Sequence, residues 1–91
     1  MKTKNDSIPY GKIISTQDIG NIVRATRKAQ GATQAEFASL CDIGVRFLSE
    51  LENGKSTAEL GKVLDVIQSL GLELRLQPRG WSTVNKNDRW L

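Results

Sequence analysis

Apolar residues recur at helical spacing over four stretches of this chain, and this pattern predicts a mainly all-α fold. The two central stretches are short and lie on either side of the tripeptide Asp42-Ile43-Gly44, which predicts two short helices joined by a sharp turn. The predicted helices cover residues 15–30, 33 to the turn at 42, 45–52 and 56–70. Their expected inner faces consist of Ile19, Ile22, Val23 and Thr26; Phe37, Ala38 and Leu40; Phe47, Leu48 and Leu51; and Leu60, Val63, Leu64, Ile67 and Leu70.

Helix boundaries are indicated by capping residues. A Ser or Thr hydroxyl at a helix start can accept from the amide three residues on, and an acidic residue there can bond back to the first amide. This arrangement is predicted for Ser15 with Asp18, Thr33 with Glu36, and Ser56 with Glu59. Glycine favours the left-handed conformation that closes a helix, and the expected closing residues are Gly31, Gly54 and Gly71.

After Gly71 the period of the pattern changes from helical to alternating. Residues 72–77 read Leu-Glu-Leu-Arg-Leu-Gln, and Pro78 follows, which predicts a short half-buried strand. A single strand cannot satisfy its own backbone hydrogen-bonding groups. Its partner is either the segment Lys12–Ile14 or the same strand of a second subunit.

Composition restricts the classes of function. The 91 residues suffice for one small domain, and the polar N-terminal residues resemble no signal peptide, so a cytoplasmic protein without membrane contact is expected. The chain has one cysteine, Cys41, and no histidine, which leaves no intrachain disulfide and no usual zinc site. No catalytic constellation and no phosphate-binding glycine motif occurs, so neither an enzyme nor a cofactor is predicted.

Charge by itself says little about the partner. The formal net charge is +3, both ends of the chain are basic, and the middle is acidic through Glu36, Asp42, Glu50, Glu52 and Glu59. Bulk charge therefore does not carry a prediction of DNA binding.

The central stretch carries a family resemblance. The residues concerned are Thr33, Gln34, Glu36, Ala38, Ile43, Leu48, Ser49, Glu52, Asn53 and Gly54. In type and spacing they resemble the helix-turn-helix of the phage repressor and Cro (XRE-type) family. Residues 46–52, 57–64 and 70–72 are also similar to HipB-type antitoxins, a narrower branch. The chain departs from the family pattern at Gly44, where a capping Ser or Thr is usual, and at Cys41-Asp42, which replaces the common pair of an apolar residue and glycine.

The resemblance implies a lambda-repressor-like domain of four to five helices with one short C-terminal β-strand. HipB-type antitoxins form two-fold dimers partly through a strand at this position, so pairing across a dimer through Leu72, Leu74 and Leu76 is favoured. The expected organisation is an N-terminal arm (1–14), a helix-turn-helix domain (15–71), a dimerisation strand (72–78) and a flexible tail (79–91).

The resemblance also implies a DNA-binding surface. Its groove-facing residues are Val45, Arg46, Ser49 and Glu50, and Gly44 belongs to the same DNA-binding set. Gln34 is expected to contact a phosphate and brace the recognition helix, and Asn53 and Lys55 are expected to hold the DNA backbone. Arg46 can bond guanine in paired fashion, and Glu50 can accept from cytosine N4. The alternative for Glu50 is that it pairs with a neighbouring cation.

Inside the domain, the resemblance implies an ion pair between Arg27 and Glu52. The alternative is that Arg27 faces solvent or a phosphate.

These features favour a sequence-specific repressor that binds double-stranded DNA at an inverted repeat. The HipB resemblance implies an antitoxin that represses its own operon and neutralises a HipA-like serine/threonine kinase toxin. Trp81 and Trp90 are candidates for partner anchors, with the alternative that Trp81 folds back on the dimer and Trp90 has no role. The other readings are a stand-alone regulator, such as a phage repressor or a restriction-modification controller, and a protein-interaction module without a toxin.

Overall fold

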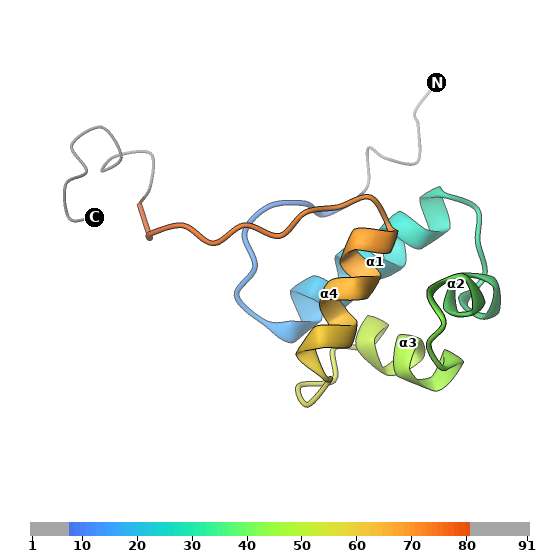
Figure 1. The fold of residues 1–91 in the computed structure, drawn as a ribbon. Helices are drawn as coiled ribbons and strands as arrows, with labels where there is room; N and C mark the ends of the chain where they lie inside the picture. Colours follow the sequence, from blue (N-terminus) through green and yellow to red (C-terminus); the bar gives the residue numbers. More distant parts are fainter. Residues whose placement is uncertain (1–7, 81–91) are drawn as a thin grey trace, which may run out of the picture.

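A computed structural model describes residues 8–80 of the chain, and within this range it contains four helices and no strand. The helices are α1 (Thr16–Ala29), α2 (Gln34–Cys41), α3 (Val45–Glu52) and α4 (Leu60–Ser69). Helix α4 crosses in front of α1, while α2 and α3 lie together at the other side of the domain (Figure 1). The prediction of a mainly all-α helix-turn-helix fold is confirmed.

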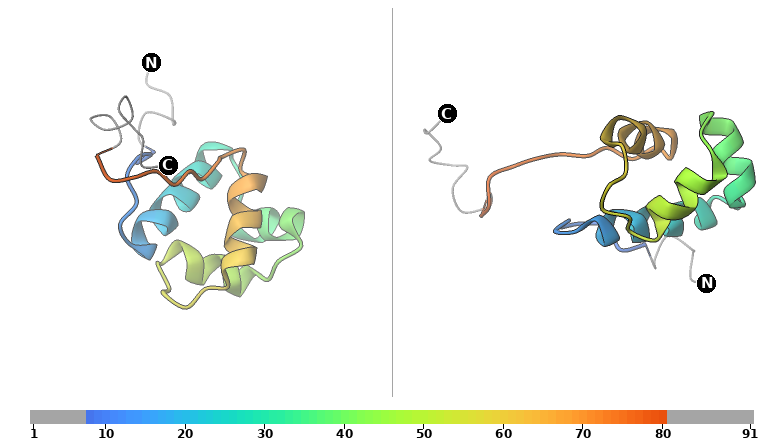
Figure 2. Two further views of the ribbon diagram at one scale, coloured as in Figure 1. Left: turned by 60° about the vertical axis from the view of Figure 1, so that its left-hand side comes forward. Right: turned by 90° about the horizontal axis from the view of Figure 1, so that it is seen from below.

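One hydrophobic core joins the four helices. Leu48, Val23 and Val66 are its largest fully buried side chains, and they come from α3, α1 and α4. Phe37 and Ala38 form the inner face of α2. Because Ala38 is small, α2 can approach its neighbours closely. The two views in Figure 2 show the helices arranged around this common centre.

The N-terminal half of α1 packs directly on the end of α3. Gly20 is buried there, and a Cβ atom at this position would overlap the carbonyl oxygen of Leu51 and lie 2.8 Å from that of Glu52. Only a residue without a side chain permits this approach. The requirement was not recognised in the sequence, where Gly20 looks like an unfavourable residue inside a helix.

Two of the three predicted capping boxes are confirmed. At Ser15 with Asp18, and at Thr33 with Glu36, the hydroxyl accepts from the third amide and the carboxylate accepts from the first. The prediction at Ser56 is wrong, because α4 begins only at Leu60 and its N-cap residue, Glu59, makes no side-chain cap bond. Ala58, which precedes the helix, is half-buried and packs against the core.

The predicted helix ends are correct. Gly31, Gly54 and Gly71 all have positive φ, as the left-handed closing conformation requires. At the end of α4 the amide of Leu72 donates to the carbonyl of Ile67 over 3.1 Å, which completes a Schellman motif.

Two predicted core residues prove to be exposed. Leu40 of α2 is 80% exposed and Leu60 of α4 is 65% exposed. In α4 the predicted residues Val63, Ile67 and Leu70 are buried as expected, and Val66 joins them in place of Leu60. A face with Leu60 and a face with Val66 both have helical spacing, and only packing against the other helices distinguishes them.

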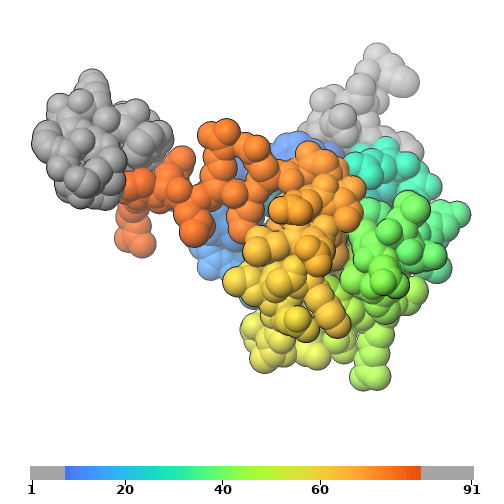
Figure 3. Space-filling model, in the orientation of Figure 1, coloured from blue at the N-terminus to red at the C-terminus, as the bar shows by residue number. Residues whose placement is uncertain are grey.

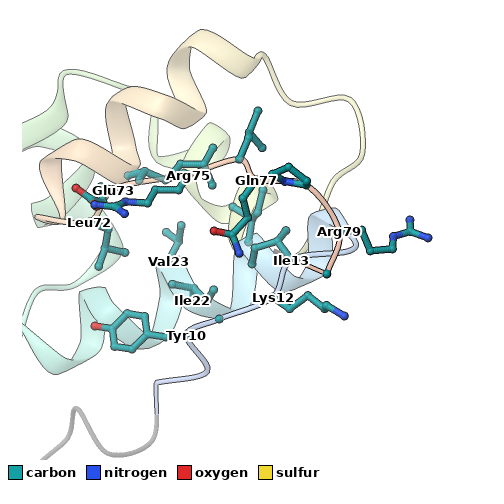
Figure 4. Close-up of a pocket in the computed structure, with 17 residues that line it drawn as sticks. Tyr10, Lys12, Ile13, Ile22, Val23, Leu72, Glu73, Arg75, Gln77 and Arg79 are labelled. Atoms are coloured by element: carbon teal, nitrogen blue, oxygen red, sulfur yellow. The ribbon is translucent and has the colours of Figure 1, made fainter. Parts of the chain in front are cut away.

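Residues 72–78 leave the helical body as an extended segment (Figure 1). Within the described residues 8–80 they form no strand, and no backbone hydrogen bond joins them to Lys12–Ile14. The intrachain pairing considered for this segment is therefore wrong. The segment and the N-terminal residues Tyr10–Ile13 instead line an open groove over Ile19 and Ile22 of α1 (Figure 4). The space-filling view shows the start of this segment lying against the body of the domain and its far end, toward residue 80, extending beyond it (Figure 3).

Thr26 supplies a prediction about stability. Its hydroxyl oxygen is buried in the core and has no hydrogen-bond partner among residues 8–80. Thr26→Val keeps the shape and removes the unsatisfied group, so we expect a stabilisation of roughly 1 kcal/mol in chemical denaturation. The matched control is Thr16→Val, since the hydroxyl of Thr16 donates to the carbonyl of Gly54 over 2.7 Å. The control variant should lose stability, and a loss in Thr26→Val as well would contradict the prediction.

Candidate nucleic-acid interface

The turn between α2 and α3 is built from three residues with distinct backbone roles. Asp42 takes the left-handed conformation, with φ of 58°, and the amide of Ile43 donates to the carbonyl of Ala38 over 3.0 Å. Aspartate is among the few non-glycine residues that adopt this conformation readily. Asp42 thus serves where the family has glycine, and Gly44 becomes the N-cap of α3 without a side-chain bond. The predicted start of this helix, at Val45, is confirmed.

Helix α3 has one buried and one outward side. Leu48 and Leu51 are buried in the core, whereas the side chain of Arg46 is 91% exposed. Val45 is also exposed, and Ser49 and Glu50 are half-buried on the same side of the helix. The structure therefore brings the predicted groove-facing residues together on one surface, with Gly44 exposed at its N-terminal edge.

A buried ion pair fixes this helix to the rest of the domain. The guanidinium of Arg27 in α1 donates from Nε to Glu52 Oε2 over 2.6 Å and from Nη2 to Oε1 over 2.9 Å, and the two side chains are 6% and 1% exposed. Hydrogen bonding to Glu52 raises the pKa of Arg27 above its ordinary value, and this effect outweighs the burial that lowers it. The pairing implied by the family resemblance is confirmed.

Gln34 and Ala32 complete this network from the start of α2. Gln34 donates from Nε2 to Glu52 Oε1 over 2.9 Å, and Arg27 donates from Nη1 to the carbonyl of Ala32 over 2.8 Å. Gln34 is therefore placed to brace α3, as the family resemblance implies. The carboxylate of Glu52 links α1, α2 and α3 at one point.

The end of α3 is closed by the segment Asn53-Gly54-Lys55. The amide of Gly54 donates to the carbonyl of Leu51, and the amide of Lys55 donates to that of Glu50, each over 3.0 Å. The side-chain amide of Asn53 donates to the carbonyl of Ser49 over 2.9 Å. These bonds hold Asn53 and Lys55 at the exposed C-terminal edge of the same surface.

Glu50 is engaged with two cations on this surface. Its carboxylate accepts from Lys55 Nζ over 3.0 Å and from Arg46 Nε over 3.4 Å. The hydrogen bond from Lys55 is the main reason that the pKa of Glu50 lies below its ordinary value, so this group is ionised at neutral pH. The cation pairing weighed as an alternative in the sequence is thus present in the structure. Its signal was the Schellman ending, which places Lys55 beside Glu50.

Other kinds of site receive no support from the described part of the chain. Residues 8–80 contain no group of three or more His, Cys, Asp or Glu side chains placed to hold a metal ion. Cys41 is a free, half-buried thiol packed against the core. No helix in this range is long and apolar enough to cross a membrane. Trp81 and Trp90, predicted as partner anchors, lie outside the described residues.

Sequence comparison finds relatives among DNA-binding regulators. A model of the helix-turn-helix family matches residues 23–77. An uncharacterised HTH-type transcriptional regulator of Sinorhizobium fredii (strain NBRC 101917 / NGR234), y4mF, is 44% identical over 69 residues, which are 76% of this chain and 91% of that protein. A second regulator of the same strain, y4dL, is 33% identical over 64 residues, which are 70% of this chain and 33% of that protein.

Solved structures with the same fold include complexes of HipB. A HipB–O4 20mer complex superposes with a TM-score of 0.69 at 29% identity, covering 76% of this chain and 97% of the matched chain. A HipA–HipB–O2–O3 complex contains a chain that matches with the same TM-score, identity and coverage. The match covers nearly the whole of the HipB chain, so the likeness extends well beyond the two central helices.

Proposed function

Because the chain belongs to the XRE-type helix-turn-helix family of DNA-binding transcriptional regulators, we propose that it is a sequence-specific repressor that reads its operator with α3. The observation that carries this proposal is the two-sided structure of α3. Its apolar side is fixed in the core, and its other side presents Arg46, Val45 and Ser49 outward from a rigid support. A helix that enters the major groove must expose such a row of side chains at its N-terminal half.

Each residue of this surface has a role that follows from its chemistry. Arg46 can donate two bonds to guanine O6 and N7, Ser49 can bond to several bases, and Val45 can contact a thymine methyl group. Gly44 carries no side chain and allows the backbone to approach the DNA closely. Gln34, Asn53 and Lys55 lie together at the C-terminal end of α3, where they would bond phosphates and fix its position.

The difference between base reading and backbone binding gives a test. Arg46→Ala should cost about 1–3 kcal/mol at one guanine and relax the sequence preference at that base pair. Lys55→Ala should weaken binding to all DNA sequences alike. It should also reduce the dependence of affinity on salt concentration by about one charge. Fluorescence anisotropy with operator, single-base variants and random DNA at several salt concentrations separates these effects. If both variants bind every sequence as the wild type does, α3 is not the reading helix.

We propose further that the repressor is a two-fold dimer held through Leu72, Leu74 and Leu76. Leu76 is 94% exposed and Leu74 is 43% exposed, and residues 73–78 have no backbone hydrogen-bond partner within residues 8–80. An extended edge with alternating leucines favours addition of a strand from a second copy. Such a dimer would read an inverted repeat with half-sites about one helical turn, roughly 34 Å, apart.

The likeness to HipB supports a more specific proposal, in which the chain is the antitoxin of a HipBA-like operon. It would repress that operon and bind a HipA-like serine/threonine kinase toxin. The support is the match of one chain in a HipA–HipB–O2–O3 complex over 76% of this sequence.

The kinase partner can be tested in two steps. The neighbouring reading frame is identified, and if it encodes a kinase-like protein, the two proteins are co-expressed and purified through the kinase. We expect the full chain to co-purify. A chain ending at Pro78 should still bind the operator, since α3 and the leucine segment precede the cut. Loss of the kinase alone would identify the tail with Trp81 and Trp90 as its anchor, and absence of any kinase would favour a stand-alone regulator.

A further inference from the structure

Glu50 occupies the middle of the reading surface, yet its carboxylate is already engaged within the protein. It lies 3.0 Å from Lys55 Nζ and 3.4 Å from Arg46 Nε. Arg46 is the residue expected to read guanine, and Lys55 is expected to bind a phosphate. One acidic group therefore connects a base-reading cation with a backbone-binding cation.

The backbone holds this arrangement in place. Arg46 and Glu50 are four residues apart on α3, so their side chains share one face of the helix. The amide of Lys55 donates to the carbonyl of Glu50 itself, which returns the chain to the side of the helix where the Glu50 side chain lies. The contact between Lys55 and Glu50 thus follows from the backbone geometry at the end of α3, which places the two residues side by side.

We propose that Glu50 is a specificity-determining positioning residue that acts through Arg46 and Lys55 and disfavours non-specific DNA. This inference rests on the proposed function of α3 as the reading helix. It replaces the expectation that Glu50 accepts directly from cytosine, because both of its nearest partners are cations of the protein.

Arg46 is oriented by the contact. Its Nε–H points to Glu50, so both terminal amino groups remain available for the paired acceptors of guanine. A guanidinium whose Nε–H is bonded to a carboxylate keeps a defined orientation. The Arg46 side chain therefore loses less conformational freedom when it binds DNA. Discrimination at that guanine should therefore depend on Glu50 although Glu50 does not touch the base.

On random DNA the Glu50 carboxylate should lower the affinity. Lys55 would bind a phosphate on any sequence. Without a guanine in place, Arg46 too could bind only a phosphate, and because phosphates lie at the edge of the groove and not at its floor, its guanidinium would have to turn away from Glu50 to reach one. The carboxylate would then face the polyanion without a counterion, which is unfavourable. On the operator the guanine contact of Arg46 is made with its pairing to Glu50 intact, so the penalty is smaller.

The test is a double-mutant cycle on discrimination. Glu50→Gln, Arg46→Ala and the double variant are measured against operator, an operator with the guanine pair replaced, and random DNA, at matched salt. Glu50→Gln should raise affinity for random DNA by about fivefold, the effect of one nearby charge in water. It should also reduce discrimination at the guanine pair, and it should change that discrimination no further when Arg46 is already alanine.

A matched control is Asp65→Asn, which removes one negative charge from an exposed position on α4 and should leave the preference for operator unchanged. Unchanged thermal unfolding of Glu50→Gln separates positioning from a loss of fold. The inference is overturned if Glu50→Gln alters the preference only at a G·C pair other than the one that Arg46 reads, which would make Glu50 a direct reader of cytosine. It is also overturned if the ratio of operator to random affinity in Glu50→Gln equals that of the wild type. Failure of the proposed function looks different, because Arg46→Ala and Lys55→Ala would then change no DNA affinity at all.

Discussion

Glu52→Ala is expected to destabilise the fold by about 3–5 kcal/mol, which is a large part of the stability of a small domain. The variant leaves the Arg27 guanidinium buried without its counterion, and it also removes the acceptor for Gln34. A buried charge without a partner costs far more than the intact pair contributes. Urea denaturation at a fixed protein concentration measures the effect, since dimerisation would make stability depend on concentration.

The chain offers a matched control in Glu50→Ala. Glu50 lies two residues earlier on the same helix and is also ion-paired, but its partners are exposed. Pairs of this kind contribute little, so the unfolding midpoint of the control should hardly change. Glu52→Leu combined with Arg27→Met should recover much of the loss, because it removes both charges from the core. Equal midpoints for Glu52→Ala and Glu50→Ala would show that the buried pair is unimportant for stability.

The buried pair is among the features that sequence reasoning could reach, and so is much of the central motif. Thr33 with Glu36 defined the start of α2, and Gly54 defined the end of α3, because capping depends on residues a few positions apart. The pair between Arg27 and Glu52 spans 25 residues and came from the family resemblance. Local chemistry therefore determined these two boundaries, although it misplaced the start of α4, and the family resemblance supplied the long-range contact.

The features that sequence reasoning missed depend on packing between helices. In α4, a buried face that includes Leu60 and one that includes Val66 both have helical spacing. Packing against α1 and α2 determines which face is buried. Gly20 is required only because the carbonyl groups at the end of α3 come close to α1. The pairing of Glu50 with Lys55 needed the geometry of the helix end as well as the residue types.

Leu74→Asp should convert the proposed dimer to a monomer at micromolar concentration and weaken operator binding by on the order of 100-fold or more. The loss is this large because linking two reading helices makes the second binding event intramolecular, and that linkage can contribute a factor of about 10²–10⁴. The variant places a charge in the centre of the alternating segment, where a partner strand would bury it. Sedimentation and anisotropy on operator DNA measure the two effects separately.

The control for this prediction is Leu60→Asp, which makes the same change at an exposed leucine of α4 outside the proposed interface. It should stay dimeric and bind the operator as the wild type does. A further comparison uses DNA with only one half-site, on which wild type and Leu74→Asp should bind with similar affinity because α3 is intact in both. If Leu74→Asp remains dimeric with unchanged helicity, the leucine segment is not the interface.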